Sequence, residues 1–355
     1  MGRLTYYPGC SLRHSAAEFD ISTRLVLHKL GVDFVEVPDW TCCGSSPAHM
    51  TDHLLAQGLA ARNLRQAATV GDEMVAPCPS CYQRQKDAEL EIEEDPGFRQ
   101  TVNEVLDLPY EGSVRVLTLP EVLLEKSGVE AIRRRVTTDL VKLRVVPYYG
   151  CLLGRPSSLT GEADEEQPTS MDRLLEAAGA TVQRWNYKTE CCGASVGMPK
   201  AEIHRRLSRK VLDQALEAGA DAVAVACPLC HQNLDLRQVQ INAAFGSSYS
   251  VPILYVTQVL GLAFGYSDEE MLLHKHAVDP RPLVAKAIKE AVAFREEEAR
   301  LASEHEARQK MKEAAKQDRA RRRAGRVPST EEGGAAPEEA VPATSAHDRE
   351  EEAAG

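Results

Sequence analysis

The sequence predicts an α/β fold built from two pseudo-repeated βαβ cysteine-rich domains, followed by a C-terminal helix and an acidic tail. Strand-like and helix-like segments alternate along the chain, and ten cysteines recur in two sets of the same pattern. Strands that alternate with helices favour parallel sheets, because each helical crossover returns the next strand in the same direction. We therefore expect the cysteines, which follow the strands, to converge at the strand ends in one crevice.

The bulk composition is that of a globular chain. Its 355 residues, 43% hydrophobic and 27% charged, can bury one large core or two ordinary ones. The longest apolar runs, 222–226 and 256–264, are shorter than the roughly 20 residues that span a membrane, and the amino terminus lacks a signal core. We expect no membrane span and a cytoplasmic location. Since that compartment keeps thiols reduced, ten cysteines indicate metal or redox chemistry rather than disulfides.

The two halves repeat one order of elements. A strand leads to a first cysteine, a helix ends at glycine, a second strand leads to Cys-Cys-Gly, and another helix and strand lead to Cys-Pro-x-Cys. The first half carries an additional connecting helix and strand at about 96–119. The repeated segments are strands 4–7 and 148–149, helices ending at Gly31 and Gly179, strands 32–37 and 181–185, helices 51–68 and 201–218, and strands 74–76 and 222–226.

The predicted boundaries are 1–120 for the first cysteine-rich domain, 121–285 for the second, 286–325 for a charged helical extension and 326–355 for a disordered acidic tail. The extension begins with Val284, Ile288 and Val292 on one helical face and then becomes polar. Of the net charge of −11, the tail contributes −6, from eight acidic and two basic residues. The tail has no aromatic residue, so little apolar burial offsets the entropy of ordering it. The basic cluster 319–323 lies beside this tail at a helix end, and we expect no nucleic-acid binding.

The cysteine spacing is the most specific feature of the sequence. In the first half 31 residues separate Cys10 from Cys42-Cys43, and in the second 39 separate Cys151 from Cys191-Cys192. In both halves 34 residues then lead to Cys-Pro-x-Cys, and the eight extra residues of the second half fall in a polar loop at 161–168. The two sets are Cys10, Cys42, Cys43, Cys78 and Cys81, and Cys151, Cys191, Cys192, Cys227 and Cys230.

Five thiols per set indicate a polynuclear site. A zinc ion is satisfied by four ligands, and adjacent cysteines suit a cluster with separate irons better than a single ion. Two iron-sulfur clusters are therefore expected, with one cluster plus zinc as the alternative. The sequence has no Cys-x-x-Cys-x-x-Cys run and no Gly-x-Gly-x-x-Gly, so partner proteins must supply the electrons.

These motifs resemble the B subunit of heterodisulfide reductase, whose tandem cysteine-rich domains carry Cys…Cys-Cys-Gly…Cys-Pro-x-Cys twice. The resemblance covers about residues 3–285, including the segments 40–44 and 276–282. It implies that each set of five cysteines ligates a noncubane [4Fe-4S] cluster, and that a disulfide is cleaved reductively between the clusters. It also implies an oxidoreductase acting on a sulfur group, with a ferredoxin-like C subunit and a flavin-binding A subunit as partners and a small disulfide or thiol as substrate.

Two functions stay open on the sequence alone. The first is a catalytic subunit that reduces or forms a disulfide. The second is a non-catalytic electron-transfer subunit, because related two-copy proteins serve lactate, glycolate and glycerol-3-phosphate oxidation. Reduction of a disulfide requires protons, so His49 and His231 are candidate catalytic proton donors, with His14 a further candidate. Lys188, near the second cysteine pair, is a candidate to balance thiolate charge. For each of the four, a solvated or packed side chain is the alternative.

Overall fold

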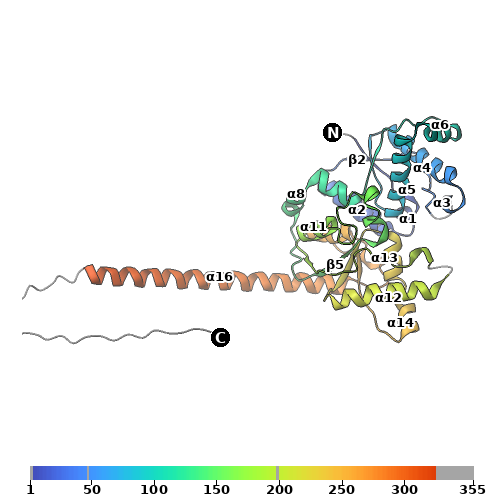
Figure 1. Ribbon diagram of the computed structural model, residues 1–355. Helices are drawn as coiled ribbons and strands as arrows, with labels where there is room; N and C mark the ends of the chain where they lie inside the picture. The colour runs from blue at the N-terminus through green and yellow to red at the C-terminus, as the bar shows by residue number, and fades with distance from the viewer. Residues whose placement is uncertain (1–2, 46–47, 197–199, 325–355) are drawn as a thin grey trace, which may run out of the picture. The chain divides into compact units, whose positions relative to one another are not determined.

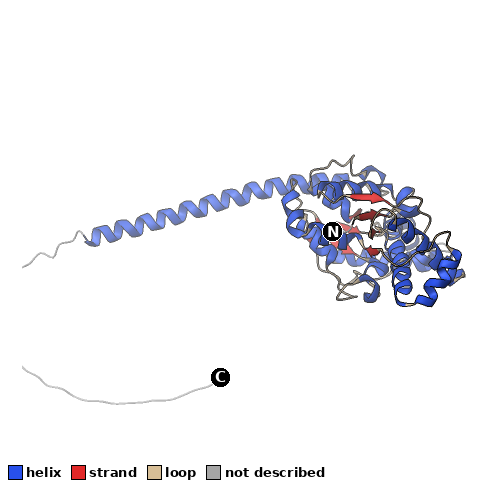
Figure 2. Cartoon of the chain, turned by 90° about the horizontal axis from the view of Figure 1, so that it is seen from above, coloured by secondary structure: helices blue, strands red, loops and turns tan. Residues whose placement is uncertain are grey.

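A computed structural model describes residues 3–45, 48–196 and 200–324 of the chain. It confirms the duplicated α/β fold, with one four-stranded parallel sheet in each half. The strand orders, β2-β1-β3-β4 and β6-β5-β7-β8, are the same, and helices surround both sheets (Figure 2). The strands are β1 Leu4–Tyr6, β2 Phe34–Glu36, β3 Glu73–Val75, β4 Arg115–Leu117, β5 Arg144–Tyr148, β6 Thr181–Val182, β7 Ala222–Val225 and β8 Ile253–Tyr255.

The helices follow the strands in the expected alternation (Figure 1). Those of the first half are α1 Gly9–Arg13, α2 Ala17–Lys29, α3 Ala48–Thr51, α4 His53–Ala68, α5 Pro79–Glu94, α6 Pro96–Val105, α7 Leu119–Val122, the π-helical turn Leu123–Ser127 and α8 Val129–Arg135. Those after β5 are α9 Gly150–Gly154, α10 Ser157–Thr160, α11 Ser170–Ala177, α12 Ala201–Glu217, α13 Pro228–Asp235, α14 Gln238–Phe245, α15 Val256–Ala263 and α16 Arg281–Ala324, with 3₁₀ turns at Ala194–Val196 and Leu273–Lys275.

The local signals that end and begin helices act where the sequence predicts. Gly31 and Gly179, with φ of +74° and +83°, follow the last residues of α2 and α11. The two Cys-Pro-x-Cys segments open α5 and α13, with Pro at the first helical position. The predicted helix 51–68 is divided, because the Asp52 carboxylate accepts a hydrogen bond from Leu55 N at 2.7 Å and starts α4 at His53.

The buried face of α16 differs from the prediction. Val284 and Ala287 are buried and Ala291 is fully buried, whereas Val292 is 53% exposed. The apolar face therefore follows the small side chains of the helix rather than its largest ones, because alanine fits where the helix lies close to the core. Ile288 is half-buried and packs against the hydrophobic core.

The two halves pack into one compact unit, Met1–Glu296. Ser22 Oγ of α2 and Thr257 Oγ1 of α15 lie 2.7 Å apart, and both side chains are buried. Gln83 Nε2, two residues after Cys81, donates to the carbonyl of Leu152 at 2.8 Å, and Leu152 follows Cys151. In the same way, Gln232, two residues after Cys230, donates to the carbonyl of Ser15 at 3.5 Å. The two helices that carry the last cysteine of each set, α5 and α13, therefore each contact the other half.

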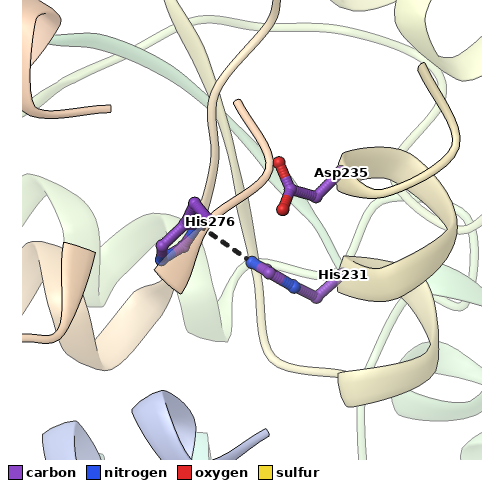
Figure 3. Close-up of side chains that lie close together, drawn as sticks. All are labelled: His231, Asp235 and His276. Carbon is purple, nitrogen blue, oxygen red and sulfur yellow. Dashed lines mark hydrogen bonds between the residues drawn. The ribbon is translucent and has the colours of Figure 1, made fainter. Parts of the chain in front are cut away.

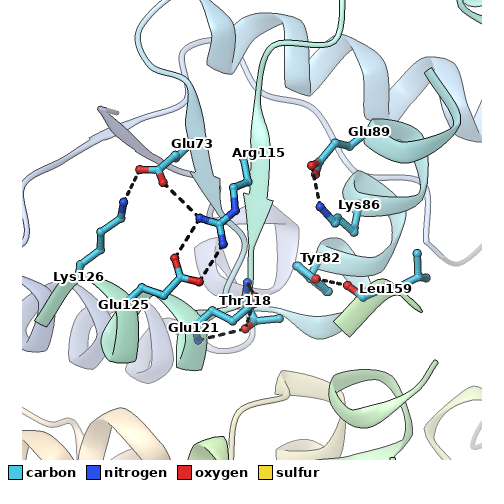
Figure 4. A network of polar contacts seen from close by, with 10 residues as sticks. All are labelled: Glu73, Tyr82, Lys86, Glu89, Arg115, Thr118, Glu121, Glu125, Lys126 and Leu159. Atoms are coloured by element: carbon cyan, nitrogen blue, oxygen red, sulfur yellow. Dashed lines mark hydrogen bonds and ion pairs between the residues drawn. The ribbon is translucent and has the colours of Figure 1, made fainter. Parts of the chain in front are cut away.

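A polar network fixes the β3–β4 edge of the first sheet (Figure 4). Arg115 on β4 pairs with Glu125 at 2.8 Å and lies 3.7 Å from Glu73 on β3, which also pairs with Lys126 at 2.5 Å. In the same view the hydroxyl of Tyr82, next to Cys81, donates to the carbonyl of Leu159 in the second half. The ion pairs therefore attach β3 and β4 to the π-helical turn Leu123–Ser127.

The second unit starts at Glu297 and contains the rest of α16, in which exposed pairs such as Lys310 with Glu306 are spaced one turn apart. The predicted tail 326–355 lies outside the described residues, and the boundaries at 120 and 285 stay a prediction. Among the described residues no helix is both long and apolar enough to cross a membrane.

Candidate iron-sulfur site

The ten cysteines lie where strands end, in equivalent places in the two halves. In the first half Cys10 is on α1 after β1, Cys42 and Cys43 follow β2, and Cys78 and Cys81 open α5 after β3. In the second half the same places after β5, β6 and β7 carry the other five cysteines. Because β1 lies between β2 and β3, and β5 between β6 and β7, each set gathers at one edge of its sheet.

The sulfurs within a set contact one another without forming disulfides. Cys43 Sγ lies 3.3 Å from Cys81 Sγ, and Cys192 Sγ lies 3.5 Å from Cys230 Sγ, whereas a disulfide bond is about 2.05 Å long. All ten cysteines are free thiols, and Cys10 and Cys42 are exposed. Each set is therefore a compact group of sulfur ligands. The first set is open to solvent at Cys10 and Cys42.

Within each set some thiols donate hydrogen bonds to others, and Cys43 and its equivalent Cys192 both have a lowered pKa because of such bonds. Hydrogen bonds from Cys42 and Cys81 lower the pKa of Cys43 to about 3. A hydrogen bond from Cys151 lowers the pKa of Cys191 to about 6. The pKa of Cys81 is raised because it donates in this way. Complete ionisation of such a group requires a cationic centre to offset the repulsion between thiolates, as iron does.

Two glycines let the backbone approach the sulfurs closely. Gly9 and Gly150, each just before the first cysteine of its set, have φ of +63° and +66°. A β-carbon on Gly9 would lie 3.0 Å from Cys81 Sγ, and one on Gly150 would lie 2.9 Å from Cys230 Sγ. Glycine is required at both positions for its backbone angle and for its lack of a side chain.

Two buried tyrosines position the adjacent cysteine pairs. Tyr7 and Tyr148 stand three residues before the first cysteine of each set, and both are buried. The Tyr7 hydroxyl donates to the carbonyl of Thr41 at 2.6 Å, and the Tyr148 hydroxyl donates to that of Glu190 at 2.5 Å. Thr41 and Glu190 directly precede the cysteine pairs. Burial, followed by the surrounding cysteines, raises the pKa of both tyrosines, so the hydroxyls stay protonated and donate.

Further polar side chains hold the second set. Asn233 Nδ2 lies 3.6 Å from Cys192 Sγ, and Ser208 Oγ donates to the carbonyl of Cys192 at 2.8 Å. Both side chains are buried. Sequence reasoning did not identify these two residues or the two tyrosines, although the repeated tyrosine before each first cysteine was a visible signal.

His231, next to Cys230, belongs to a buried cluster with Asp235 and His276 (Figure 3). His231 Nε2 lies 3.1 Å from His276 Nδ1, and Asp235 accepts bonds from the backbone N of Ala277 and Val278 at 2.7 and 3.0 Å. Burial lowers the pKa of His231 to about 3 and that of His276 to about 4, so both rings are neutral. Because these groups already bond within the protein, the cluster attaches segment 276–278 to α13.

A neighbouring amide fixes the tautomer of His276. Gln258 Oε1 accepts from Tyr255 N at 2.9 Å, so Gln258 Nε2 is the donor to His276 Nε2, also at 2.9 Å. The proton of the neutral His276 ring is then on Nδ1. His231 Nε2 lies 3.1 Å from His276 Nδ1 and also 3.1 Å from the carbonyl oxygen of Ile253.

The other sequence candidates are not members of this cluster. His49, on α3, and His14 are exposed. Lys188 is buried, and its Nζ pairs with Asp172 and with the carbonyl of Pro168, each at 2.8 Å. The positive charge of Lys188 is thus matched by a carboxylate of α11.

The comparisons with known proteins agree with this geometry. A family model described as a cysteine-rich domain (CCG) matches residues 4–84 and 145–235, one copy in each half. The chain is 32% identical over 294 residues to the B subunit of the ferredoxin/F420H2-dependent CoB-CoM heterodisulfide reductase of Methanosarcina acetivorans, covering 81% of this chain and 97% of that one. The chain belongs to the family of heterodisulfide reductase B subunits.

Two other proteins are similar to this chain, one in sequence and one in fold. The 8-methylmenaquinol:fumarate reductase membrane anchor subunit of Wolinella succinogenes is 30% identical over 281 residues, covering 78% of this chain and 98% of that one. A crystal structure of a hypothetical protein from Helicobacter pylori matches with a TM-score of 0.61 at 13% identity, covering 78% of this chain and 52% of that one, and shows the fold alone. Membership of the B subunit family implies an iron-sulfur protein of an oxidoreductase complex, and the two groups of free thiols fit iron-sulfur clusters.

Proposed function

We propose that this chain is the iron-sulfur catalytic subunit of a heterodisulfide-reductase-like complex, which reduces or forms a disulfide at two noncubane [4Fe-4S] clusters. The observation that supports it most strongly is the gathering of five thiols at the same edge of each sheet. A set of five exceeds the four ligands of a closed tetrahedral ion. The proposed ligands are Cys10, Cys42, Cys43, Cys78 and Cys81 for one cluster and Cys151, Cys191, Cys192, Cys227 and Cys230 for the other.

The chain's own residues hold and orient these centres. The clusters, when bound, supply the electrons and the iron to which the sulfurs of a disulfide bind. Tyr7 and Tyr148 fix the backbone before the paired cysteines, and Gly9 and Gly150 let it approach the sulfurs. The exposed thiols of Cys10 and Cys42 leave one side of the first set accessible to a small substrate.

His49 and His231 remain the predicted proton donors. His231 is neutral, and its Nε2 lies 3.1 Å from both His276 Nδ1 and the carbonyl of Ile253, so it exchanges protons inside a buried polar cluster. The exposed His49 exchanges protons with solvent directly. The two residues therefore suit different parts of a proton path, one buried and one at the surface.

The second candidate function is a non-catalytic relay that passes electrons between a dehydrogenase partner and another carrier, as in lactate, glycolate or glycerol-3-phosphate oxidation. The similarity to a component of a menaquinol:fumarate reductase favours it. The ligands would be the same, so what distinguishes the two functions is whether sulfur of an external compound reaches a cluster.

The test is spectroscopic and uses the full chain purified without oxygen. Two clusters predict about eight irons per chain and no zinc, whereas one cluster plus zinc predicts about four irons and one zinc. Addition of 2-mercaptoethanol or its disulfide is expected to change the electron paramagnetic resonance spectrum of the oxidised protein. An unchanged spectrum with intact clusters would leave the relay function and reject the catalytic one.

The predicted partners are a ferredoxin-like C subunit and a flavin-binding A subunit, as the resemblance to heterodisulfide reductase implies, and they match the lack of a ferredoxin-type cysteine run and of a dinucleotide motif in the sequence. A cytoplasmic location also stays a prediction. Affinity purification of the tagged full chain from its native cells is expected to recover both partners with flavin. Recovery of a dehydrogenase without the flavin-binding partner would favour the relay.

A further inference from the structure

The hydroxyl of Tyr255 is buried without a partner. Tyr255 is the last residue of β8, its side chain is fully buried, and none of the described residues forms a hydrogen bond with its hydroxyl oxygen. A buried polar group left unpaired is destabilising, and most such groups in proteins have a partner. The position therefore indicates a partner that is not part of this chain.

The tyrosine ring is held between two other rings. It stacks on Phe19 of α2 with centroids 4.3 Å apart and on His231 of α13 with centroids 4.4 Å apart, and both pairs are within 12° of parallel. His231 is itself held by His276 and, through it, by Gln258. The direction of the hydroxyl is therefore fixed by packing from both halves of the molecule.

The hydroxyl lies in the electrostatic field of both sets of thiols. Burial raises the pKa of Tyr255 most, followed by the charges of Glu18, Cys227 and Cys78. Cys227 and Cys78 belong to different sets, and Val225, two residues before Cys227, pairs with Tyr255 in the sheet. A tyrosine hydroxyl is protonated at neutral pH, so the hydroxyl of Tyr255 can donate a hydrogen bond.

The corresponding residue of the first half has no such free hydroxyl. Thr118 precedes α7 as Tyr255 precedes α15, with Glu121 and Gln258 at the third helical positions. The Thr118 hydroxyl accepts from Glu121 N at 3.2 Å and donates to the Glu121 carboxylate at 2.7 Å (Figure 4). The unpaired donor is therefore specific to the second half and is not a requirement of the shared fold.

We propose that the Tyr255 hydroxyl donates a hydrogen bond to anionic sulfur bound between the two sets of cysteines. The sulfur is either a sulfide of a cluster or the thiolate of a bound substrate. The inference rests on the proposed function for the presence of that sulfur, and it adds a residue that stabilises the reduced sulfur. A hydrogen bond to an anion contributes about 1.5–3 kcal/mol, so its loss corresponds to at least a tenfold effect.

The test compares wild type with Tyr255→Phe and with a matched control, Tyr110→Phe, in the full chain with its clusters. Tyr110 is also buried, and its hydroxyl accepts from Val114 N at 3.0 Å, with glutamates rather than cysteines as its charged neighbours. Two quantities are measured: the midpoint potentials of the clusters without thiol, and the apparent Kd for 2-mercaptoethanol from the paramagnetic resonance spectrum.

A sulfide partner predicts a lower midpoint potential in Tyr255→Phe, because the bond stabilises the more negative reduced state. A substrate thiolate predicts an unchanged potential and a Kd raised roughly tenfold or more. Tyr110→Phe is expected to match wild type in both. If Tyr255→Phe also matches wild type in both, the inference is wrong, whereas the proposed function fails separately if thiol leaves the wild-type spectrum unchanged.

A third measurement applies if Tyr255→Phe loses its iron. The wild-type spectrum recorded by electron-nuclear double resonance in H2O and D2O reports exchangeable protons close to the cluster spin, with and without thiol. A coupled exchangeable proton in addition to those of the Gly193 amide and Asn233 Nδ2, which lie beside sulfurs of the second set, supports the hydrogen bond in either state. If neither state shows one, the inference is overturned.

Discussion

Replacement of Gly150 by alanine tests how closely the backbone must approach the second set of thiols. Gly150 has a φ of +66°, where an L-residue with a β-carbon costs about 1–2 kcal/mol. That β-carbon would lie 2.9 Å from Cys230 Sγ, closer than the about 3.5–4.0 Å of a relaxed carbon contact. Because Cys230 is buried at the start of α13, either the sulfur or the loop before Cys151 has to move. We expect a loss of stability larger than the conformational cost and a loss of iron from one set.

Gly246 provides the matched control. Its φ is +65°, and no atom lies within 4 Å of a β-carbon placed on it. Gly246→Ala is expected to lower the free energy of unfolding by about 1–2 kcal/mol and to leave iron binding unchanged. The assay is urea unfolding of the full chain, with iron and sulfide measured after anaerobic reconstitution. If Gly150→Ala and Gly246→Ala lose equal stability and both bind the wild-type amount of iron, the close approach to Cys230 has no role in the site.

Three further predictions concern a proposed ligand, a tyrosine that positions a cysteine pair, and an ion pair outside the site. Cys230→Ser is expected to remove about one cluster, roughly four irons per chain, and elemental analysis with resonance spectra would show whether the other cluster remains. Tyr148→Phe removes the hydrogen bond to the carbonyl of Glu190, and urea unfolding should detect a loss of about 1 kcal/mol that an unchanged midpoint would contradict. Burial raises the pKa of Asp221, but the hydrogen bonds and charge of Arg144 outweigh this effect, so the pKa is lower in the folded protein than in the unfolded chain. The pair therefore stabilises the fold at a pH above the pKa of the unfolded chain. This stabilisation is lost as the pH falls through the pKa of the folded protein. Asp221→Asn should therefore cost roughly 0.5–1 kcal/mol at pH 7 and nothing in strong acid, and a difference that persists in acid would exclude this origin.

The ligands and the repeated fold could be predicted because their signals are local. Cysteine spacing survives insertions in loops, and the glycines and prolines that end or begin helices act within a few residues. The residues that position the cysteines and their neighbours could not be predicted, because their roles depend on contacts between distant segments. Gln258 and His276 are 18 residues apart and meet through a turn, while Phe19 and Tyr255 meet across the two halves. A single sequence does not show which buried tyrosine faces a thiol and which faces only apolar side chains.

The duplicated chain keeps its ligands alike and varies the residues beside them. After the last cysteine of each set the first half has Tyr82, bonded to the carbonyl of Leu159, and the second has His231, stacked on Tyr255. Two identical surroundings would treat both sulfurs of a disulfide equally. If the partner of Tyr255 is a substrate thiolate, that sulfur gains a hydrogen-bond donor, which makes it the more stable thiolate and the better leaving group. The asymmetry at this one residue would then give cleavage of a mixed disulfide a preferred direction.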